Sequence, residues 1–421
     1  MRILFITAYY LPLNAIAAHR IKGFVDSCER SGIEFDVITR KYDEEQCKGL
    51  DMFIASKAPS NFNFDYIKEG NVYYTNFDEN NWFYQTSKRL PKGIRGLFNY
   101  LVNDVFHYGW FGFIIKVFEQ ELIGNKYDFI VSSYGPLVSL MAANRLSKKY
   151  AIPFVADFRD SFIDGSEKFP HAQLKKWQLK SILKNCFACT FASGGMQDIF
   201  YSSMNGSLKS IPSEIIYNGT ELNRDDHYSN SDKDIVERFK GIQSANDIVL
   251  LYTGTLYAGQ DINFYIEAVN EFLNLYPGVK IALVFLGLPE NNLPELFKYS
   301  FMHFLPRVQF KTSLFLQKSA SALLSPVWLG RYTGFTGKIF EYLSSGNFVI
   351  VGPNPQKDIS HFLQNFENAL VCNEVDQFYK ILFQIKDSKS KLKSVLRQDL
   401  LSREHWSDQF ISYLVRLKKT K

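Results

Sequence analysis

Lys338 and Glu341 are the two residues of this chain whose types and spacing best fit a binding site. They lie in the stretch YTGFTGKIFEYLSSGNFVIVGP, where glycines precede a short predicted helix and an apolar strand follows it. Side chains three positions apart lie on the same side of a helix. A lysine in the first turn adds positive charge at a helix end that already attracts anions through its free backbone N–H groups. A glutamate one turn later can accept two hydrogen bonds from a vicinal diol.

The residues around this pair leave two interpretations. We expect the helix to begin at about Thr336, so that backbone N–H groups near Thr336 and Gly334 face a ligand. The helix is apolar over most of its surface, and a carboxylate buried there without a partner would be costly. A lysine for a phosphate and a glutamate for a ribose together indicate a nucleotide-diphosphate site. The alternative is an ordinary helix on which Lys338 and Glu341 form a surface ion pair.

The length and composition of the chain exclude some classes of protein. A chain of 421 residues, 46% of them hydrophobic, predicts two or three domains with well-formed cores. Its formal net charge of +5 is too small to indicate a nucleic-acid partner. The opening MRILFITAYYLPL is typical of a first strand rather than a secretion signal. No apolar stretch of the sequence reaches the roughly 18–20 residues that a membrane span needs.

Cysteine and histidine give no sign of a metal site. The five cysteines are an odd number in a long chain, which fits a reducing cytoplasm. Cys186 and Cys189 form a C-x-x-C, but they lie in an apolar, strand-like run without a second pair. We therefore favour two strand cysteines over a metal or redox centre. The seven histidines are scattered along the chain, and we expect a cytoplasmic protein without a metal.

Strands and helices alternate over residues 1–219. Helical spacing connects Ile21, Phe24 and Val25 after the first strand. Strands that are apolar throughout and lie between amphipathic helices indicate a parallel sheet covered on both faces. Strands are expected at 2–8, 35–39, 128–133, 153–158, 187–193 and 214–219, with helices over 137–149 and up to residue 184. This region is predicted to be a Rossmann-like domain.

A second alternating pattern follows a polar stretch. Residues 220–246 are rich in charged and small polar residues and are predicted to be a linker. After them, Asp261 is expected to cap an amphipathic helix. Further strands are expected at 248–252, 280–287, 307–310 and 322–327. Residues 247–400 are therefore predicted to form a second Rossmann-like domain, followed by a final helix over 401–421.

The predicted fold is two doubly wound, parallel-sheet α/β domains that face each other across a central cleft. In such sheets ligands bind beyond the carboxyl ends of the strands. Neither first strand is followed by G-x-G-x-x-G, since the chain continues as AYYLPLNA after one and TGTLYAGQ after the other. The pattern therefore argues against a dinucleotide dehydrogenase, and the sequence contains no P-loop.

The stretch GKIFEYLSSGNFVIV resembles the donor-site signature of family-4 retaining glycosyltransferases, which have the GT-B fold and include enzymes that build bacterial surface polysaccharides. Other segments are similar to that family in the same order along nearly the whole chain. They are ILFITAYYLPLNAIAAHRIKGFVDSCERSGIEFDVITRK, IPFVADFRDSF, EIIYNGTE, LYTGTLYAGQDINFYIEAV and REHWSDQFISYLVRL. The resemblance implies the GT-B fold, with the last segment as a helix that crosses back to the first domain.

The resemblance also implies which substrate each of the two domains binds. The second domain binds a nucleotide sugar, expected to be a UDP-sugar, and the first binds a glycan or lipid-linked acceptor in O-antigen or capsule synthesis. The sugar is transferred with retention and without a metal or another cofactor, and D-F-R-D is not the D-x-D spacing of metal-dependent sugar transferases. Lys338 and the backbone N–H groups after Gly254 and Gly334 stabilise the leaving diphosphate. The implied donor residues are Gly254, Thr255, Gln260, Thr333, Gly334, Thr336, Lys338 and Glu341.

The chain departs from the family pattern at three places. Thr333 stands where many relatives have a glutamate that grips the transferred sugar. Thr255 and Gln260 stand where many have an arginine and a lysine, so the site is less cationic than is usual. A histidine common in the first domain is missing, and Asp157 and Asp160 lie in that region instead. These departures leave the donor sugar undetermined.

Candidates for catalysis and for acceptor binding follow from these positions. Asp160 is either a base or orienting group, or a loop carboxylate bonded to neighbouring N–H groups. Residues after the first strand and in the SSYGP turn are expected to meet the acceptor, or to have a purely structural role in their loops. The catalytic candidates are Asp160, Asp157 and Lys338, and the acceptor candidates are Asn14, His19, Arg20 and Ser133.

A basic cluster precedes an aromatic-rich helical pattern over residues 88–122. Lys88, Arg89 and Lys92 are followed by large apolar side chains such as Trp110. This combination is typical of a helix in a membrane interface, and a core helix with a solvated basic end is the alternative. With a lipid-linked acceptor, the protein would be peripheral on the cytoplasmic face of the membrane.

Two other classes of function fit this architecture. A nucleotide-sugar epimerase of GT-B-like fold needs more acid–base groups in its cleft than the sequence offers, so we rank it below a transferase. A degenerate, non-catalytic subunit would fit the missing glutamate at Thr333 and the missing cations at Thr255 and Gln260. Donor hydrolysis would favour the active transferase, whereas nucleotide binding without turnover would favour the degenerate subunit.

Overall fold

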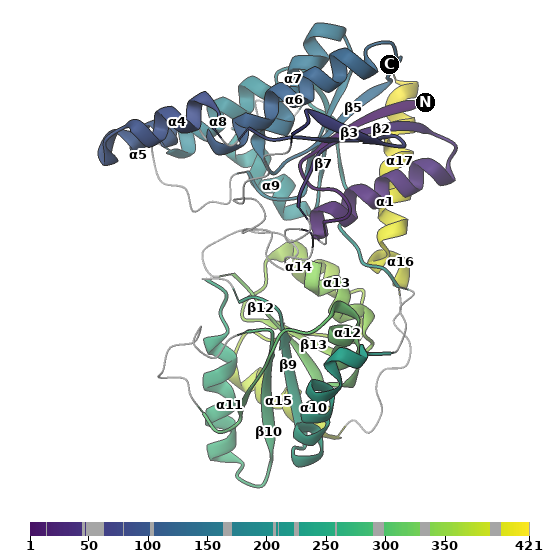
Figure 1. Ribbon diagram of the computed structural model, residues 1–421. Helices are drawn as coiled ribbons and strands as arrows, with labels where there is room; N and C mark the ends of the chain where they lie inside the picture. Colours follow the sequence, from purple (N-terminus) through teal and green to yellow (C-terminus); the bar gives the residue numbers. More distant parts are fainter. Residues whose placement is uncertain are drawn as a thin grey trace. The chain divides into compact units, whose positions relative to one another are not determined.

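The structure of the protein is a computed structural model with two compact α/β units (Figure 1). Unit 1 comprises Met1–Asn218 and Arg403–Lys421, and unit 2 comprises Gly219–Ser402. The residues that the structure describes are 1–13, 15–43, 47, 63–78, 80–101, 105–162, 171–204, 208, 210–222, 227–256, 259–288, 299–328, 337–387 and 397–420.

Unit 1 is built on an eight-stranded sheet with the strand order β3-β4-β2-β1-β5-β6-β7-β8. Neighbouring strands are parallel except β3 and β4, which are antiparallel. The strands are β1 (Arg2–Thr7), β2 (Glu34–Arg40), β3 (Tyr66–Glu69), β4 (Val72–Thr75), β5 (Phe129–Ser133), β6 (Phe154–Phe158), β7 (Cys186–Phe191) and β8 (Ser213–Ile215). The helices are α1 (Ile16–Arg30), α4 (Trp82–Arg89), α5 (Lys92–Leu101), α6 (Phe111–Val117), α7 (Leu137–Tyr150), α8 (His171–Leu183), α9 (Gly194–Ser203) and α17 (Arg403–Lys419), with a 3-10 turn at Val105–Trp110 and a π turn at Phe118–Leu122.

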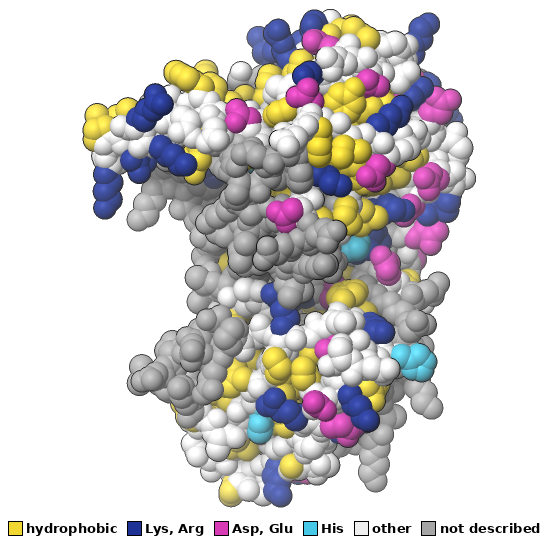
Figure 2. Space-filling view, viewed as in Figure 1, with side chains coloured by type: hydrophobic (Ala, Val, Ile, Leu, Met, Phe, Trp, Pro, Cys, Tyr) yellow, Lys and Arg dark blue, Asp and Glu magenta, His cyan; other side chains and the backbone are white. Residues whose placement is uncertain are grey.

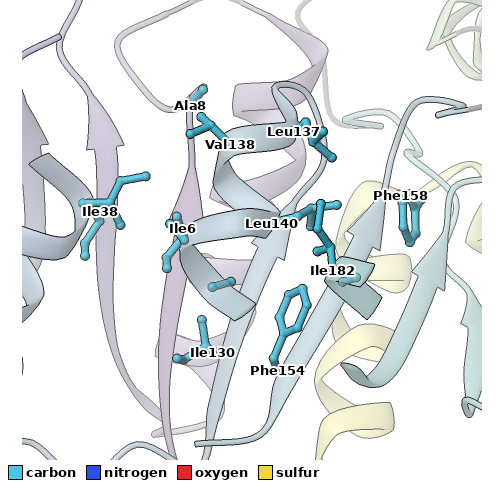
Figure 3. Packing of buried hydrophobic residues seen from close by; sticks show 14 of the residues in the cluster. Ile6, Ala8, Ile38, Ile130, Leu137, Val138, Leu140, Phe154, Phe158 and Ile182 are labelled. Carbon is cyan, nitrogen blue, oxygen red and sulfur yellow. The ribbon is translucent and has the colours of Figure 1, made fainter. Parts of the chain in front are cut away.

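Alternate residues of β1 fill the cores on the two faces of this sheet. Leu4 and Ile6 pack on one face with Leu140 of α7 and its neighbours (Figure 3). Ile3 and Phe5 pack on the other face with apolar side chains of α1 and α17. Helices cover both faces, which explains why the strand is apolar throughout.

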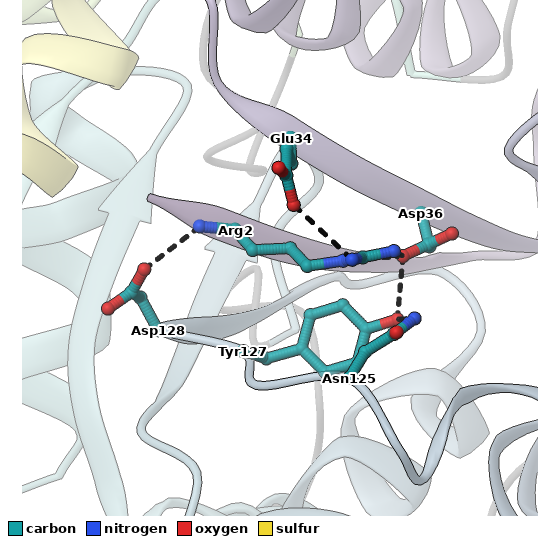
Figure 4. Close-up of polar contacts among 6 residues, drawn as sticks. All are labelled: Arg2, Glu34, Asp36, Asn125, Tyr127 and Asp128. Carbon is teal, nitrogen blue, oxygen red and sulfur yellow. Dashed lines mark hydrogen bonds and ion pairs between the residues drawn. The ribbon is translucent and has the colours of Figure 1, made fainter.

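A polar cluster ties the amino ends of β1, β2 and β5 (Figure 4). The guanidinium of Arg2 pairs with Asp36 at 2.8 Å, and its backbone N–H donates to the Asp128 carboxylate at 2.9 Å. The Tyr127 hydroxyl donates to Asp36 at 2.7 Å. Lys418 near the end of α17 pairs with Asp128 at 2.8 Å. The amino edge of the sheet is thus held by internal contacts, and a ligand site belongs at the carboxyl edge.

The last helix of the chain packs on α1. The rings of Phe24 and Phe410 stack with 3.9 Å between their centroids. Gly23 of α1 lies where a Cβ would be 2.6 Å from the Ser407 Oγ, so the missing side chain lets the two helices approach. The chain therefore returns to unit 1 after completing unit 2.

Unit 2 is built on a six-stranded parallel sheet with the order β11-β10-β9-β12-β13-β14. Numbered within the unit, this is the order 3-2-1-4-5-6, whose direction reverses between β9 and β12, the point where such sheets bind ligands. The strands are β9 (Ile248–Thr253), β10 (Ile281–Leu286), β11 (Met302–Leu305), β12 (Ala322–Pro326), β13 (Phe348–Gly352) and β14 (Ala369–Val371). The helices are α10 (Lys233–Ala245), α11 (Asn263–Leu275), α12 (Phe310–Ser319), α13 (Gly337–Ser344), α14 (Lys357–Leu363), α15 (Val375–Asp387) and α16 (Gln398–Leu401), with a 3-10 turn at Asn230–Asp232.

Two predicted elements of unit 2 differ from the structure. The range 220–246, predicted to be a linker, contains α10, which buries Val236 and Phe239 and exposes its many charged residues. The strand predicted at 307–310 is instead β11, which ends at Leu305 before Pro306, and α12 begins at Phe310. Proline cannot donate a hydrogen bond to a neighbouring strand, so it ends the pairing there.

Candidate functional site

Two glycines end neighbouring strands at the carboxyl edge of the unit 2 sheet. Gly254 follows β9 with φ +80°, and Gly287 follows β10 with φ +83°, in the left-handed region that favours glycine. The Gly254 N–H donates to the Leu286 carbonyl at 2.7 Å, and the Gly287 N–H donates to the Leu305 carbonyl at 2.9 Å. A Cβ on Gly287 would lie 3.8 Å from the Gly254 Cα. The strand ends are thus fixed in a row with no side chain from either glycine.

Helix α13 is anchored to the end of β9 by Tyr342. The hydroxyl of this buried tyrosine accepts a hydrogen bond from the Thr253 N–H at 2.9 Å and lies 2.9 Å from the Thr253 Oγ1. Burial raises the pKa of Tyr342 to about 12, so the hydroxyl stays neutral. Ile339 and Leu343 of the same helix are buried as well. Packing and this hydrogen bond therefore fix the position of the first turn of α13 relative to the glycines.

Lys338, in that first turn, extends over the end of β9. Its Nζ donates to the Tyr252 hydroxyl at 3.1 Å and to the Thr255 carbonyl at 3.2 Å, and it lies 4.5 Å from the centroid of the Tyr252 ring. A Cβ on Gly254 would lie 3.2 Å from this Nζ. A side chain at residue 254 would therefore crowd the ammonium group of the lysine.

The Tyr252 hydroxyl brings several predicted donor residues together. It lies 2.8 Å from the Thr255 carbonyl and 3.2 Å from the Gln260 Oε1, as well as next to Lys338. Gln260 in turn forms a β-bridge with Trp328, beyond the end of β12. Four residues predicted to bind the donor therefore lie close together at the end of β9, next to β12. They are Gly254, Thr255, Gln260 and Lys338. Tyr252 itself was missed, because a tyrosine in an apolar strand carries no sign of a polar role.

The electrostatics of Lys338 suit an anion. Burial lowers the pKa of Lys338 to about 8, while the charge of Glu341 raises it and the charge of Arg307 lowers it further. Glu341 is partly buried one turn along the same face of α13. A bound phosphate would restore the cationic form, because an opposite charge at close range favours it. Thr333, Gly334 and Thr336, also predicted to belong to the site, lie outside the described residues.

In unit 1 the structure places three predicted site residues in a closed, buried network. Arg20 pairs with Asp157 at 2.7 Å and donates to the Ile216 carbonyl at 2.7 Å. Ser133 and Thr190 donate to the same carboxylate at 3.0 and 2.7 Å. Burial alone would raise the pKa of Asp157, but Arg20 and these hydroxyls hold it below its usual value. Arg20, Asp157 and Ser133 therefore hold α1 and the strands together, which agrees with the structural alternative, and their roles in catalysis and acceptor binding stay predictions.

Asp160 lies differently, at the exposed carboxyl edge of the unit 1 sheet. It pairs at 2.8 Å with Arg159, whose side chain is only 8% exposed while that of Asp160 is 58% exposed. The Arg159 guanidinium also donates to the Gly135 carbonyl at 3.3 Å and lies 5.0 Å from the centroid of the Tyr9 ring. Asp160 is thus held by a buried arginine and still faces solvent. His19 lies partly buried in α1, and Asn14 is outside the described residues.

Known structures match the chain over its full length. No protein-family model and no curated protein matches the sequence. A sucrose-phosphate synthase from Thermosynechococcus elongatus matches with a TM-score of 0.65 at 13% identity, covering 100% of both chains. The fold is GT-B. An E. coli trehalose-6-phosphate structure bound with UDP-2-fluoro glucose matches at 0.61, with 12% identity over 98% of this chain and 99% of that one. Anabaena HepE in complex with UDP matches at 0.58, with 13% identity over 100% of this chain and 98% of that one.

These matches confirm the predicted GT-B fold class of two Rossmann-like, parallel-sheet domains. In this GT-B chain the described residues contain no group of three or more histidine, cysteine, aspartate or glutamate side chains placed to hold a metal ion. Within the same residues, no helix is long and apolar enough to cross a membrane.

The range 88–122, predicted to meet a membrane, divides into two parts in this GT-B domain. Its second part is core: Trp110, Phe118 and Leu122 are each about 1% exposed, and the Trp110 indole donates to the Thr75 hydroxyl at 2.7 Å. The first part differs. Basic and hydrophobic side chains lie together over α4 and α5 (Figure 2), and the exposed residues of this part include Lys88, Arg89, Lys92 and Ile94. Trp82, which precedes the predicted range in α4, is exposed as well.

Proposed function

We propose that this chain is a glycosyltransferase that uses a nucleotide-diphosphate sugar, with the donor bound by unit 2. The observation that carries the proposal is the position of the Lys338 Nζ, held by Tyr252 and Thr255 over Gly254 at the end of β9, the strand that borders the switch point of the sheet. The GT-B fold supports it, because structures of that fold include one bound with UDP-2-fluoro glucose and one in complex with UDP.

Each donor residue has a distinct task in this proposal. Lys338 binds the diphosphate and stabilises the charge that develops as the sugar–phosphate bond breaks. Backbone N–H groups beside Gly254 and at the start of α13 help to stabilise the same developing negative charge. Glu341, one turn along α13, accepts hydrogen bonds from the ribose diol. The resemblance to family-4 enzymes supports UDP as the nucleotide and transfer with retention of configuration, without a metal.

Unit 1 binds the acceptor in this proposal, at the carboxyl edge that carries Asp160. The Asp160 carboxylate is exposed and paired with Arg159, which supports a role in orienting or deprotonating an acceptor hydroxyl. The buried Asp157 is less suited to that role, because its oxygens are occupied by Arg20, Ser133 and Thr190. The resemblance supports a glycan or lipid-linked acceptor in the synthesis of a surface polysaccharide.

A membrane surface is the proposed location of a lipid-linked acceptor. The exposed part of α4 and α5 offers four cations, Lys88, Arg89, Lys92 and Arg95, beside two apolar side chains, Trp82 at 69% and Ile94 at 54% exposure. Cations attract anionic headgroups, and tryptophan is favoured at the boundary between headgroups and acyl chains. With α4 and α5 bound to the headgroup region, the protein would be peripheral to the membrane.

The decisive experiment is turnover. The protein is incubated with UDP-, GDP-, dTDP- and ADP-sugars, with and without a lipid-linked oligosaccharide extract, in buffer containing EDTA. We expect release of one nucleoside diphosphate, accelerated by acceptor, and a product whose anomeric configuration by NMR equals that of the donor. Asp160→Ala should slow turnover while leaving donor affinity unchanged. An altered donor sugar without transfer would indicate an epimerase, and donor binding with neither hydrolysis nor transfer would contradict catalysis.

A further inference from the structure

Arg307 lies beside the candidate donor site at the end of a third strand. It follows Pro306, which comes directly after β11, and its side chain is exposed. A Cβ on Gly287 would lie 3.6 Å from the Arg307 Cγ and 3.8 Å from its Cα. The stem of the arginine therefore passes over the second glycine of the row, as Lys338 passes over the first.

The ends of the three strands form a connected series. Gly254 bonds to the end of β10, and Gly287 bonds to the end of β11, through backbone hydrogen bonds of 2.7 and 2.9 Å. Lys338 lies at one end of this series and Arg307 at the other. Their separation is small enough that the charge of Arg307 disfavours the charged form of Lys338. Two cations that repel each other across a row of glycines favour a ligand with more than one negative charge.

From this arrangement we infer that Arg307 is a second diphosphate-binding residue, which supplies from the end of β11 the cation that the turn after β9 lacks. That turn carries Thr255 and Gln260, both neutral. A guanidinium binds two phosphate oxygens at once, so Arg307 and Lys338 together would grip both phosphates of the donor. The inference rests on the proposed function and specifies how its donor site gains charge.

The test compares ligands that differ in phosphate content. Calorimetry measures the binding of UDP, UMP and uridine, and of the corresponding series if another base is preferred, to the wild type and to Arg307→Gln. We expect the variant to bind the diphosphate about tenfold or more weakly, because it loses a charge-assisted contact, and the nucleoside within about twofold of the wild type. Arg307→Lys should recover part of the loss. Lys280→Gln removes one charge just before β10, at the opposite edge of the same sheet, and should change nothing.

The possible outcomes distinguish a failure of the Arg307 assignment from a failure of the proposed function. If the wild type binds the diphosphate and Arg307→Gln binds it equally well, the assignment of Arg307 is overturned while the donor site stands. An equal loss for diphosphate and nucleoside would also overturn it, since the arginine would then not act on phosphate. If the wild type binds no nucleotide at all, the proposed function fails instead.

Discussion

The ammonium nitrogen of Lys338 lies 3.1 Å from the phenolic oxygen of Tyr252, a residue 86 positions earlier in the chain. The contact joins the first turn of α13 to the end of β9 and holds the ammonium group next to Gly254. A tyrosine hydroxyl gives the ammonium a hydrogen-bond acceptor without a full negative charge. The hydrogen bonds of the Lys338 ammonium to Tyr252 and to the Thr255 carbonyl therefore leave its positive charge in place.

The first prediction concerns pH. The pKa of Lys338 is lowered to about 8, so in the free protein the cation is lost as pH rises through that value. A diphosphate needs the cation, and its affinity should fall by up to about tenfold per pH unit above pH 8. Calorimetry in buffers of different ionisation enthalpy at pH 8 should show uptake of a proton on binding.

Lys338→Arg is the control for this pH dependence. Arginine stays charged throughout this range, so the variant should hold its diphosphate affinity between pH 8 and pH 9.5. The same fall in affinity in both proteins would show that another group is responsible.

The second prediction separates two aspartates of one short segment. Asp157→Ala leaves Arg20 buried without its carboxylate and should lower the free energy of unfolding by about 3–5 kcal/mol. Asp160→Ala removes an exposed partner and should cost less than about 1 kcal/mol. Urea unfolding at pH 7 measures both.

The pH dependence of this difference has a definite sign. Because the pKa of Asp157 is lowered in the folded protein, its stabilisation is present above the unfolded pKa and is lost as pH falls below about 4. The destabilisation by Asp157→Ala should therefore shrink in acid. Equal stability of the two variants at pH 7 would contradict the structural role of the Arg20–Asp157 pair.

The third prediction compares glycines in two helices. Gly23→Ala would place a Cβ 2.6 Å from the Ser407 Oγ and 3.2 Å from the Arg403 Cγ, forcing α1 and α17 apart. We expect a loss of about 1–3 kcal/mol in unfolding free energy. Gly241→Ala in α10 meets no atom within 4 Å and should stabilise the protein by up to about 1 kcal/mol. Similar effects at both sites would contradict the close packing of α17.

The fourth prediction concerns the exposed part of α4 and α5. Reversing Lys88, Arg89 and Lys92 to glutamate should weaken binding to vesicles of phosphatidylglycerol and phosphatidylcholine by about a hundredfold, because each cation near an anionic surface contributes about 1 kcal/mol. Cosedimentation with vesicles measures the change. The matched control reverses the exposed cations of α10, namely Lys233, Arg238 and Lys240.

Two outcomes would contradict the membrane proposal. The wild type would fail to sediment with anionic vesicles, or the α10 control would lose as much binding as the α4–α5 variant. Trp82→Ala provides a second test. An indole that inserts into the vesicle should shift its fluorescence to shorter wavelength. The variant should therefore lack the part of the wild-type shift that comes from Trp82.

Local patterns were enough to predict most of the longer strands and several helices, but not β3, β4 and β14, and they misplaced β11. A solid apolar run marks a doubly covered strand whatever its distant neighbours are, and Ile21 and Phe24 are buried as their spacing predicted. The α10 helix was missed because only a few of its residues are apolar, and these lie on one narrow face.

Contacts between distant segments could not be predicted in the same way. Arg20 and Asp157 are 137 residues apart, and nothing local to either shows that they neutralise each other. Arg307 was hidden by the expectation that 307–310 is a strand, when Pro306 already ends β11. Tyr252 was hidden by its apolar neighbours. In each case the missing information was which strand ends meet at one edge of a sheet.

The measurement that tests the central claim most directly is the affinity of UDP, GDP, dTDP and ADP for the wild type, Lys338→Ala and Lys280→Ala at pH 7. The account predicts that one of the four binds the wild type, that Lys338→Ala weakens this binding by about tenfold or more, and that Lys280→Ala leaves it unchanged. No binding by any of the four, or equal binding by the wild type and Lys338→Ala, would contradict a donor site at the end of β9.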